Sequence, residues 1–317
     1  MFRAKDFTIA AAIGFGTALF GAVPLATSIR LARAAAGLRQ SSFTRKILPA
    51  EVGRILGIEP HTANALILRH FEERRTAFVL FLRSLSRGPA HQVDVLGAEA
   101  IDAALAGGRG VVLWVADFVY AQDVVKIGLA QRGYWASHLS QPQHGFSDSL
   151  LGLRLLNPIR TTFEARFLRE RVVYQRSRPG EAVERLLQRL RENGIVSITA
   201  TSAEGRKLCE AAFLNGRLRL APGAPKIGYR AGAPVLPVFA VPHPEAPFFR
   251  VTVESPLSTH PSSEEAAIAS AVEDYVSRLE RYVRRWPHLW AGWETVDLSG
   301  KPQPAPCPAP ATAESST

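Results

Sequence analysis

GGRGVVLWVADFVYAQDVV, residues 107–125, is the stretch that decides the fold of this chain. A glycine-rich turn leads into the unbroken apolar run VVLWV, which ends at Ala116 and Asp117. Continuous apolar runs of this length are typical of strands that are buried on both faces. The stretch therefore predicts a buried strand over residues 111–115.

Three further runs have the character of strands. IVSITA (195–200) follows the helical pattern EAVERLLQRLREN and the stop residue Gly194, and APVLPVFAV (233–241) follows a glycine-rich turn. FRVTVESPL (249–257) alternates between apolar and polar residues, which predicts an edge strand. Strands that alternate with helices indicate an α/β sandwich.

Two long segments have helical periodicity. Residues 50–86 predict helices with apolar positions at Leu66, Ile67, Phe71, Phe78 and Phe81. Residues 264–286 predict an amphipathic helix with a stripe of Ile268, Val272, Tyr275, Val276, Leu279 and Val283. The first of these segments also carries four arginines, Arg69, Arg74, Arg75 and Arg83. A solvated helix face is favoured for them over a dedicated anion site.

The N-terminal segment Phe7–Ile29 carries no charged residue over 23 positions. As a helix it would be about 34 Å long, enough to span a bilayer, although Pro24 would kink it. A membrane anchor or interfacial helix is favoured, with a cleaved signal peptide and a buried helix as alternatives. We expect this helix over residues 1–35, an α/β domain over 36–300, and a disordered Pro/Ala-rich tail over 301–317.

The charge balance favours anionic partners. Lys and Arg number 38 against 28 Asp and Glu, a formal net charge of +10, and all but six of the basic residues are arginine. Arginine suits phosphate and carboxylate groups, although a GC-rich genome produces the same bias. The sign of the charge does not choose among phospholipid headgroups, phosphorylated substrates, acidic carrier proteins and nucleic acid.

Common catalytic and cofactor motifs are missing from the sequence. There is no Walker loop, no GxGxxG after a strand, no GxSxG and no HExxH. His138, His144 and Asp148 come nearest to a cluster but lack the spacing of metal ligands. A nucleic-acid-binding module is not supported, because aromatic residues and arginines do not interleave on any strand.

The order of the segments resembles a known family. An apolar N-terminal helix is followed by HFEERRTAFVLFLRSL, GRGVVLWVADFVYAQDVV, RENGIVSITATSAEGR, FLNGRLRLAPGAPKIGYRAGAPVLPVFAV and WPHLWAGWETV. This order is similar to that of the lipid A biosynthesis (lauroyl/myristoyl) acyltransferases of the lysophospholipid acyltransferase superfamily, over roughly residues 8–296. Residues 221–238 are the most specific part of the match.

The resemblance implies a mixed sheet sandwiched by helices, held at the cytoplasmic face of the bacterial inner membrane. It also implies an acyl thioester donor, on acyl carrier protein or coenzyme A, and a lipid acceptor, with no metal or cofactor. The family's base is a histidine in a His-x4-Asp/Glu motif. Here Asp117 holds the histidine position and Gln122 the carboxylate position, with Asp123 next. An aspartate is a poor base unless burial raises its pKa.

Other residues carry weaker expectations. Ala200 and Thr201 stand where the family has an acidic or Gln-bearing pair, and Glu204 is the nearest carboxylate. Arg178, Glu204, Arg206 and Lys207 are candidate substrate-binding residues, and the three basic ones lie where charge near a substrate phosphate would be useful. Surface charge is an equal alternative for Arg178 and the favoured one for Arg206 and Lys207. His138 and His144 are further candidate bases, and His144 is expected in an exposed loop.

Two functions remain at this point. One is an acyltransferase in which Asp117 replaces the usual histidine. The other is a non-catalytic paralogue that keeps the acyl groove and serves as a lipid-binding or scaffold protein.

Overall fold

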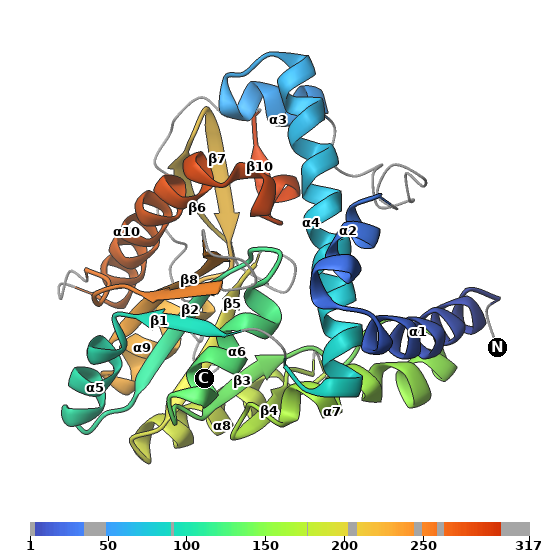
Figure 1. The fold of residues 1–317 in the computed structure, drawn as a ribbon. Coiled ribbons are helices and arrows are strands. Elements are labelled where there is room, and N and C mark those ends of the chain that lie inside the picture. The colour runs from blue at the N-terminus through green and yellow to red at the C-terminus, as the bar shows by residue number, and fades with distance from the viewer. Residues whose placement is uncertain are drawn as a thin grey trace.

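A seven-stranded mixed sheet forms the centre of the protein in the computed structural model, which describes residues 4–34, 49–89, 92–175, 177–201, 208–243, 249–258 and 263–298. Only β8 and β9 pair antiparallel, and every other neighbouring pair is parallel (Figure 1). The expected α/β sandwich with a mixed sheet is confirmed. In spatial order the strands are β1 (Val93–Leu96), β9 (Phe249–Val253), β8 (Val235–Pro242), β2 (Val111–Ala116), β5 (Ile195–Ala200), β3 (Ala136–Ser140) and β4 (Glu170–Val173).

The apolar run identified from the sequence is the central strand β2. Its six residues are all buried, and it pairs with β5 on one side and β8 on the other. The turn before β2 needs glycine at Gly110, whose φ is +67°. A Cβ there would lie 2.5 Å from the carbonyl oxygen of Gly194, so a larger residue would push β2 away from the turn that follows the helix Pro179–Arg191.

The prediction that residues 249–257 form an edge strand is wrong. β9 lies between β1 and β8, and the edges of the sheet are β1 and β4. The alternation has another cause: Phe249, Val251 and Val253 are buried, while Arg250 and Thr252 face a cavity. A polar cavity and an edge exposed to solvent produce the same period-two pattern.

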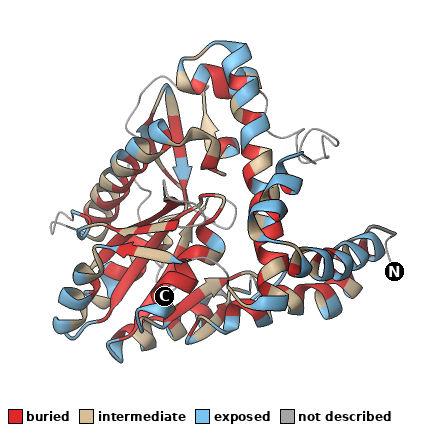
Figure 2. Ribbon diagram, viewed as in Figure 1, coloured by how far each residue is buried: buried red, intermediate tan, exposed pale blue. Residues whose placement is uncertain are grey.

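Helices cover both faces of the sheet. α6 (Ala121–Gln131) packs on β1, β8 and β9, and α8 (Pro179–Arg191) and α9 (Gly223–Ala231) pack on β5 and β2. α10 (Glu264–Arg285) buries its whole predicted stripe, and Tyr275 stacks on Trp114 with ring centroids 3.9 Å apart. Figure 2 places the buried residues in the strands and on these inner helix faces. The remaining elements are α5 (Ala98–Ala106), a π-helix (Gly152–Leu156), α7 (Asn157–Ala165) and a small antiparallel sheet of β6 (Cys209–Phe213), β7 (Gly216–Leu220) and β10 (Val296–Asp297).

The expected single helix over Phe7–Ile29 is divided into two. α1 (Ala4–Ala22) ends just before Pro24, and α2 (Leu25–Ala34) begins after it. Both pack on the long helix α4 (Pro60–Arg87), which follows α3 (Pro49–Leu56). Arg83 of α4 donates to the carbonyl oxygens of Phe20 and Val23, so a basic side chain caps the end of α1. Among the described residues, no helix has both the length and the apolar character needed to cross a membrane.

Candidate active site

A cavity of about 380 Å³ lies at the carboxyl end of β2, and we call it the Asp117 cavity. Asp117, Gln122 and Asp123 all line it, so the structure brings together the three residues that the sequence singled out. The facing wall comes from α4 and from the segment before the π-helix. Its other lining residues include Arg74, Phe78, Leu80, Phe81, Tyr120, Phe146, Arg160 and Phe249.

The Trp-rich segment after α10 holds the Asp117 loop in place. The amide of Ala291 donates to the carbonyl oxygen of Asp117 at 2.9 Å, and the amide of Val119 donates to that of Leu289 at 2.8 Å. Phe118 and Trp290 form an antiparallel bridge between these bonds. Because these two segments are joined by backbone hydrogen bonds, the backbone of Asp117 has a defined position at the cavity wall.

Burial raises the pKa of the Asp117 carboxyl to about 6, against an ordinary value of 3.8. The Arg74 guanidinium opposes this shift, and the nearby Glu294 carboxylate adds to it. A carboxylate with a pKa near 6 is a stronger base than an ordinary aspartate and is still ionised at neutral pH. Burial therefore raises the pKa of Asp117, as an aspartate that acts as a base requires.

Gln122 and Asp123 belong to a buried polar network. Arg160 of α7 donates to both carboxylate oxygens of Asp123 and also to Glu164. Glu164, only 1% exposed, further accepts from the Lys126 ammonium at 2.7 Å and from the Gln122 amide at 3.2 Å. Burial alone would raise the pKa of Glu164, but Lys126, His144 and Arg160 together hold it well below its usual range. Gln122 is therefore bonded within the network, and Asp123 is not the charge that raises the Asp117 pKa.

His144 lies in a loop, as expected, but its side chain is half-buried and not solvent-exposed. Its side chain is 21% exposed, and its Nε2 lies 2.8 Å from Glu164 Oε1 and 3.1 Å from the Gln122 amide nitrogen. His138 is buried on β3, where its Nδ1 lies 3.2 Å from the Ser197 hydroxyl. Burial lowers the pKa of His138 well below the ordinary value, so it stays neutral. Neither histidine lines the Asp117 cavity.

The remaining predicted binding residues are not at this site. Arg178 stands at the start of α8 with a side chain 70% exposed, and it pairs with Glu181 at 3.3 Å. Arg178 lines neither the Asp117 cavity nor the larger cavity that adjoins it. Glu204, Arg206 and Lys207 lie outside the described residues.

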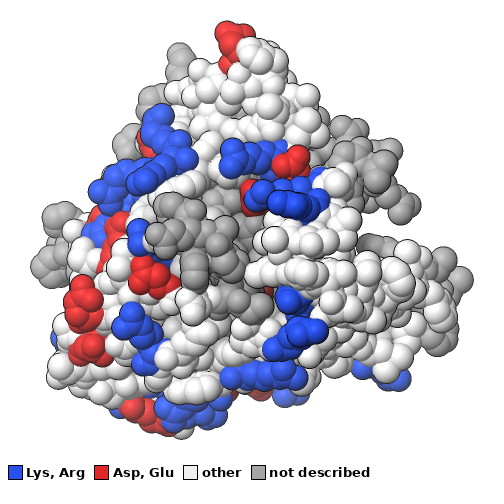
Figure 3. Space-filling view, in the orientation of Figure 1, with Lys and Arg blue, Asp and Glu red and all other residues white. Residues whose placement is uncertain are grey.

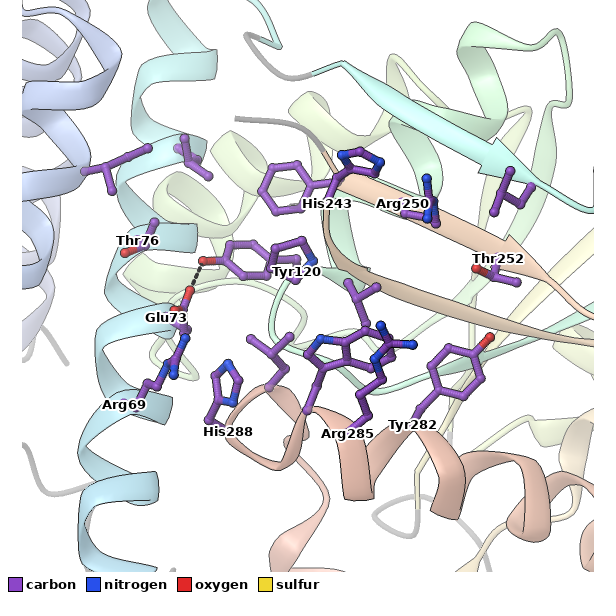
Figure 4. Close-up of a pocket in the computed structure, with 18 of the residues that line it drawn as sticks. Arg69, Glu73, Thr76, Tyr120, His243, Arg250, Thr252, Tyr282, Arg285 and His288 are labelled. Carbon is purple, nitrogen blue, oxygen red and sulfur yellow. Dashed lines mark hydrogen bonds between the residues drawn. The ribbon is translucent and has the colours of Figure 1, made fainter. Parts of the chain in front are cut away.

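A second and larger cavity, of about 740 Å³, adjoins the first, and we call it the arginine cavity. Leu80, Tyr120 and Phe249 line both cavities, so these three side chains form the shared wall. Tyr120 donates its hydroxyl proton to Glu73 of α4 at this wall (Figure 4). Basic side chains border the hollow on this face of the molecule (Figure 3). Arg33, Arg69, Arg250, Arg281 and Arg285 line the arginine cavity.

The two cavities and their walls lie almost wholly within a region that matches a known family. The model of the family described as bacterial lipid A biosynthesis acyltransferase matches residues 64–292, which is most of the chain. The chain belongs to this family. Among curated proteins, no sequence matches the chain. The matched region of this family member begins in α4 and ends just after Trp290 and Ala291, the residues that hold the Asp117 loop.

Sequence reasoning missed several residues of the site in this family member. Arg69 and Arg74 of α4 are exposed, as expected of a solvated face, but no pattern in the sequence indicated that they line the two cavities or that Arg83 caps α1. Arg160 and Glu164 were also missed, although their spacing of four residues on a helix is a recognisable ion-pair signal. Lys126 and Glu73 gave no local signal, because their partners are far away in the sequence.

Proposed function

We propose that this protein transfers a fatty acyl chain from a thioester donor, on acyl carrier protein or coenzyme A, to a membrane lipid acceptor of the lipid A type. Membership of the lipid A acyltransferase family supports the reaction class. The observation that carries the proposal is Asp117 itself. It stands at the carboxyl end of the central strand, lines a cavity, and has a pKa raised by burial to about 6.

Asp117 acts as the general base of the transfer. Its carboxylate takes the proton of the acceptor hydroxyl as the hydroxyl oxygen attacks the thioester carbonyl carbon. A carbon–oxygen bond forms, the carbon–sulfur bond breaks, and the proton passes to the departing thiolate. The products are an ester and a free thiol. A base with a pKa near 6 suits this role, because it is ionised at neutral pH and retains useful basicity.

The protein works at a membrane surface in this proposal, on the cytoplasmic face of the inner membrane. Support comes from large apolar side chains that the structure leaves in solvent on α1 and beside the π-helix. Phe7 is 61% exposed, Phe15 72%, Leu150 64% and Leu155 62%. Together with the formal net charge of +10, this surface suits the interface of an anionic bilayer.

A transfer assay on the purified full chain in detergent tests the function. Labelled acyl carrier protein and acyl coenzyme A serve as donors against a panel of lysolipids and lipid A precursors. Loss of Asp117 as base in Asp117→Asn should reduce turnover by about 10²- to 10⁴-fold. Asp117→His should retain or raise it, and Asp102→Asn, which changes an exposed aspartate, should leave it unaltered. Equal turnover in wild type and Asp117→Asn would refute the assignment of the base.

One observation favours a lipid-binding paralogue as the second candidate. The Gln122 amide is bonded to Glu164 and His144, and no described side chain hydrogen-bonds to the Asp117 carboxylate to orient it. Under this alternative, no donor and acceptor pair gives turnover, while acyl lipids still co-purify with the protein. Substitutions that fill the Asp117 cavity, such as Ala77→Phe, would then remove the bound lipid, whereas Asp117→Asn would not.

A further inference from the structure

The arginine cavity has a strong excess of positive charge. Its lining contains five arginines against a single carboxylate, that of Glu73, and His243 and His288 also line it. The basic side chains converge from three parts of the fold: α2 and α4, the β8–β9 region, and the end of α10 with the turn after it (Figure 4). A concave surface with this charge concentrates anionic ligands.

The one carboxylate of the lining does not neutralise it. Glu73 is 7% exposed and accepts the hydroxyl proton of Tyr120. Burial and the Glu73 charge raise the pKa of Tyr120, so its hydroxyl stays protonated and the hydrogen bond persists. The nearest arginine to Glu73 is Arg33, at 4.0 Å.

Two of the five arginines are available for a ligand. Arg250 pairs with Asp94 at 3.1 Å and Arg281 pairs with Glu254 at 3.3 Å, both outside the cavity lining. In the part of the chain that the structure describes, Arg69 and Arg285 form no ion pair. Both are exposed at the cavity, Arg69 on α4 and Arg285 across from it on α10. A guanidinium presents a fork of donors that matches a phosphate group.

The surroundings of these two arginines favour an anion over a cation. The Arg285 guanidinium lies 4.5 Å from the Trp286 ring centroid, a stacked position that fixes its plane. Burial, with a further contribution from the Arg69 charge, lowers the pKa of His288. The imidazole is therefore neutral at neutral pH and can serve as a hydrogen-bond donor beside a bound oxyanion.

Apolar side chains make up much of the rest of the lining, beside the hydroxyl groups of Thr76, Tyr120, Thr252 and Tyr282, and they lead towards the Asp117 cavity. The apolar lining residues are Ile29, Leu80, Leu96, Val241, Pro242, Phe249, Trp286 and Leu289. Leu80 and Phe249 also line the Asp117 cavity, so an apolar path runs along the shared wall. The pair of cavities suits a ligand with an anionic group, an apolar portion, and a reacting group near Asp117.

We propose that the arginine cavity is the binding site for a phosphate ester group of an acyl-transfer substrate, held by Arg69 and Arg285. The proposal rests on the proposed function for the identity of the substrate, but not for the binding of the phosphate. The phosphate can come from the lipid acceptor or from the phosphopantetheine arm of the donor, and the experiment separates these sources.

The test measures binding without turnover, by calorimetry, on the full chain in detergent. Two probe pairs differ only in a phosphate: 1-oleoylglycerol 3-phosphate with 1-oleoylglycerol, and 4′-phosphopantetheine with pantetheine. The variants are Arg69→Gln and Arg285→Gln. The matched control is Arg284→Gln, which removes the same charge from the neighbouring position of α10, where the side chain is 57% exposed and pairs with Glu280.

One phosphate-bearing probe should bind the wild type at least tenfold more tightly than its phosphate-free partner, and the responding pair identifies the source. Arg69→Gln and Arg285→Gln should each weaken that probe about 10- to 100-fold without altering its partner, while Arg284→Gln has little effect. Equal binding within both pairs, or an equal loss in Arg284→Gln, would overturn the phosphate site. If transfer is absent but the phosphate preference is present, the proposed function fails and the site stands.

Discussion

Burial of Asp117 would have opposite effects on the proposed chemistry and on stability. The burial that would make its carboxylate a useful base in the proposed transfer also makes the ionised form costly in the folded protein. Its folded pKa of about 6 exceeds the ordinary 3.8, so the folded state binds the proton more tightly than the unfolded state. The contribution of Asp117 to the free energy of unfolding is therefore fully present below about pH 4. It is lost as pH rises through 6, which lowers the free energy of unfolding by roughly 1–3 kcal/mol.

Asp117→Asn should therefore stabilise the protein while it slows the proposed transfer. We expect its free energy of unfolding to exceed that of the wild type by roughly 1–3 kcal/mol at pH 7.5, with the gain shrinking towards pH 4. Urea denaturation at pH 4, 5.5 and 7.5 measures this difference, with Asp102→Asn as a control that stays within about 0.5 kcal/mol of the wild type. A gain that is the same at all three pH values would contradict the link to ionisation.

Glu164 shows the reverse situation, in which a buried charge holds others in place. It is 1% exposed, and its basic partners Lys126 and Arg160 are 7% and 8% exposed. Glu164→Gln keeps the shape but leaves the Lys126 ammonium buried without a countercharge. We expect it to lower the free energy of unfolding by about 3–5 kcal/mol.

The same urea denaturation measures the Glu164 effect. The matched control is Glu181→Gln, in which a carboxylate that is 66% exposed also loses an arginine partner. Glu181→Gln should lower the free energy of unfolding by less than about 1 kcal/mol. A loss below about 1 kcal/mol in Glu164→Gln as well would mean that water reaches the network in solution.

At the level of elements, two glycines of α1 allow this helix to pack closely against α4. A Cβ added at Gly16 would lie 2.6 Å from Leu82 Cδ1, and one at Gly21 would lie 2.5 Å from the Ser86 hydroxyl oxygen. Gly14 has nothing within 4 Å of its Cβ position, so it is a control on the same helix. Small residues on one side of a helix permit this close approach of two backbones.

Hydrogen exchange of the α1 amides tests this contact. Gly16→Ala should push α1 off α4 and accelerate exchange in α1, because Leu82 is buried and the clash with it outweighs the gain in helix propensity of about 1 kcal/mol. Gly14→Ala gains the same propensity without a clash and should slow exchange. Slower exchange in both variants would indicate that α1 is not held against α4 in solution.

The elements that could be predicted are those with a strong local pattern. The apolar run of β2 and the stripe of α10 were visible in the sequence, because each reports a local burial environment. The position of β9 inside the sheet could not be predicted, because polar residues that face a cavity give the same alternation as polar residues at the edge of a sheet. Asp117 and Gln122 were found through the family resemblance, whereas the Lys126–Glu164 and Tyr120–Glu73 pairs depend on how distant elements pack.

At the scale of the whole molecule, the two cavities and the exposed apolar surface occupy a connected part of the fold. α1 and α2 pack on α4, and α4 supplies the facing walls of both cavities. The buried carboxylate of Asp6 on α1 accepts from the hydroxyls of Ser147 and Ser149, both at 2.6 Å, and so ties α1 to the segment before the π-helix. A lipid substrate that enters from a bilayer beneath α1 would therefore reach α4 and the cavities directly.

Vesicle binding tests this arrangement. Phe15→Ser removes a side chain that is 72% exposed on α1, and we expect it to lower the partition of the full chain onto anionic vesicles about tenfold, since burying one such side chain contributes about 1.5–3 kcal/mol. Trp135→Ser is the matched control: this side chain is 48% exposed but stands at the amino end of β3, whereas the π-helix follows the carboxyl end. Co-sedimentation with the vesicles measures the binding of both variants.

Raising the salt concentration should weaken vesicle binding of the wild type and of both variants by a similar factor, because salt screens the positive charge that all three proteins share. An equal loss in the two variants would mean that the bilayer does not select the α1 surface.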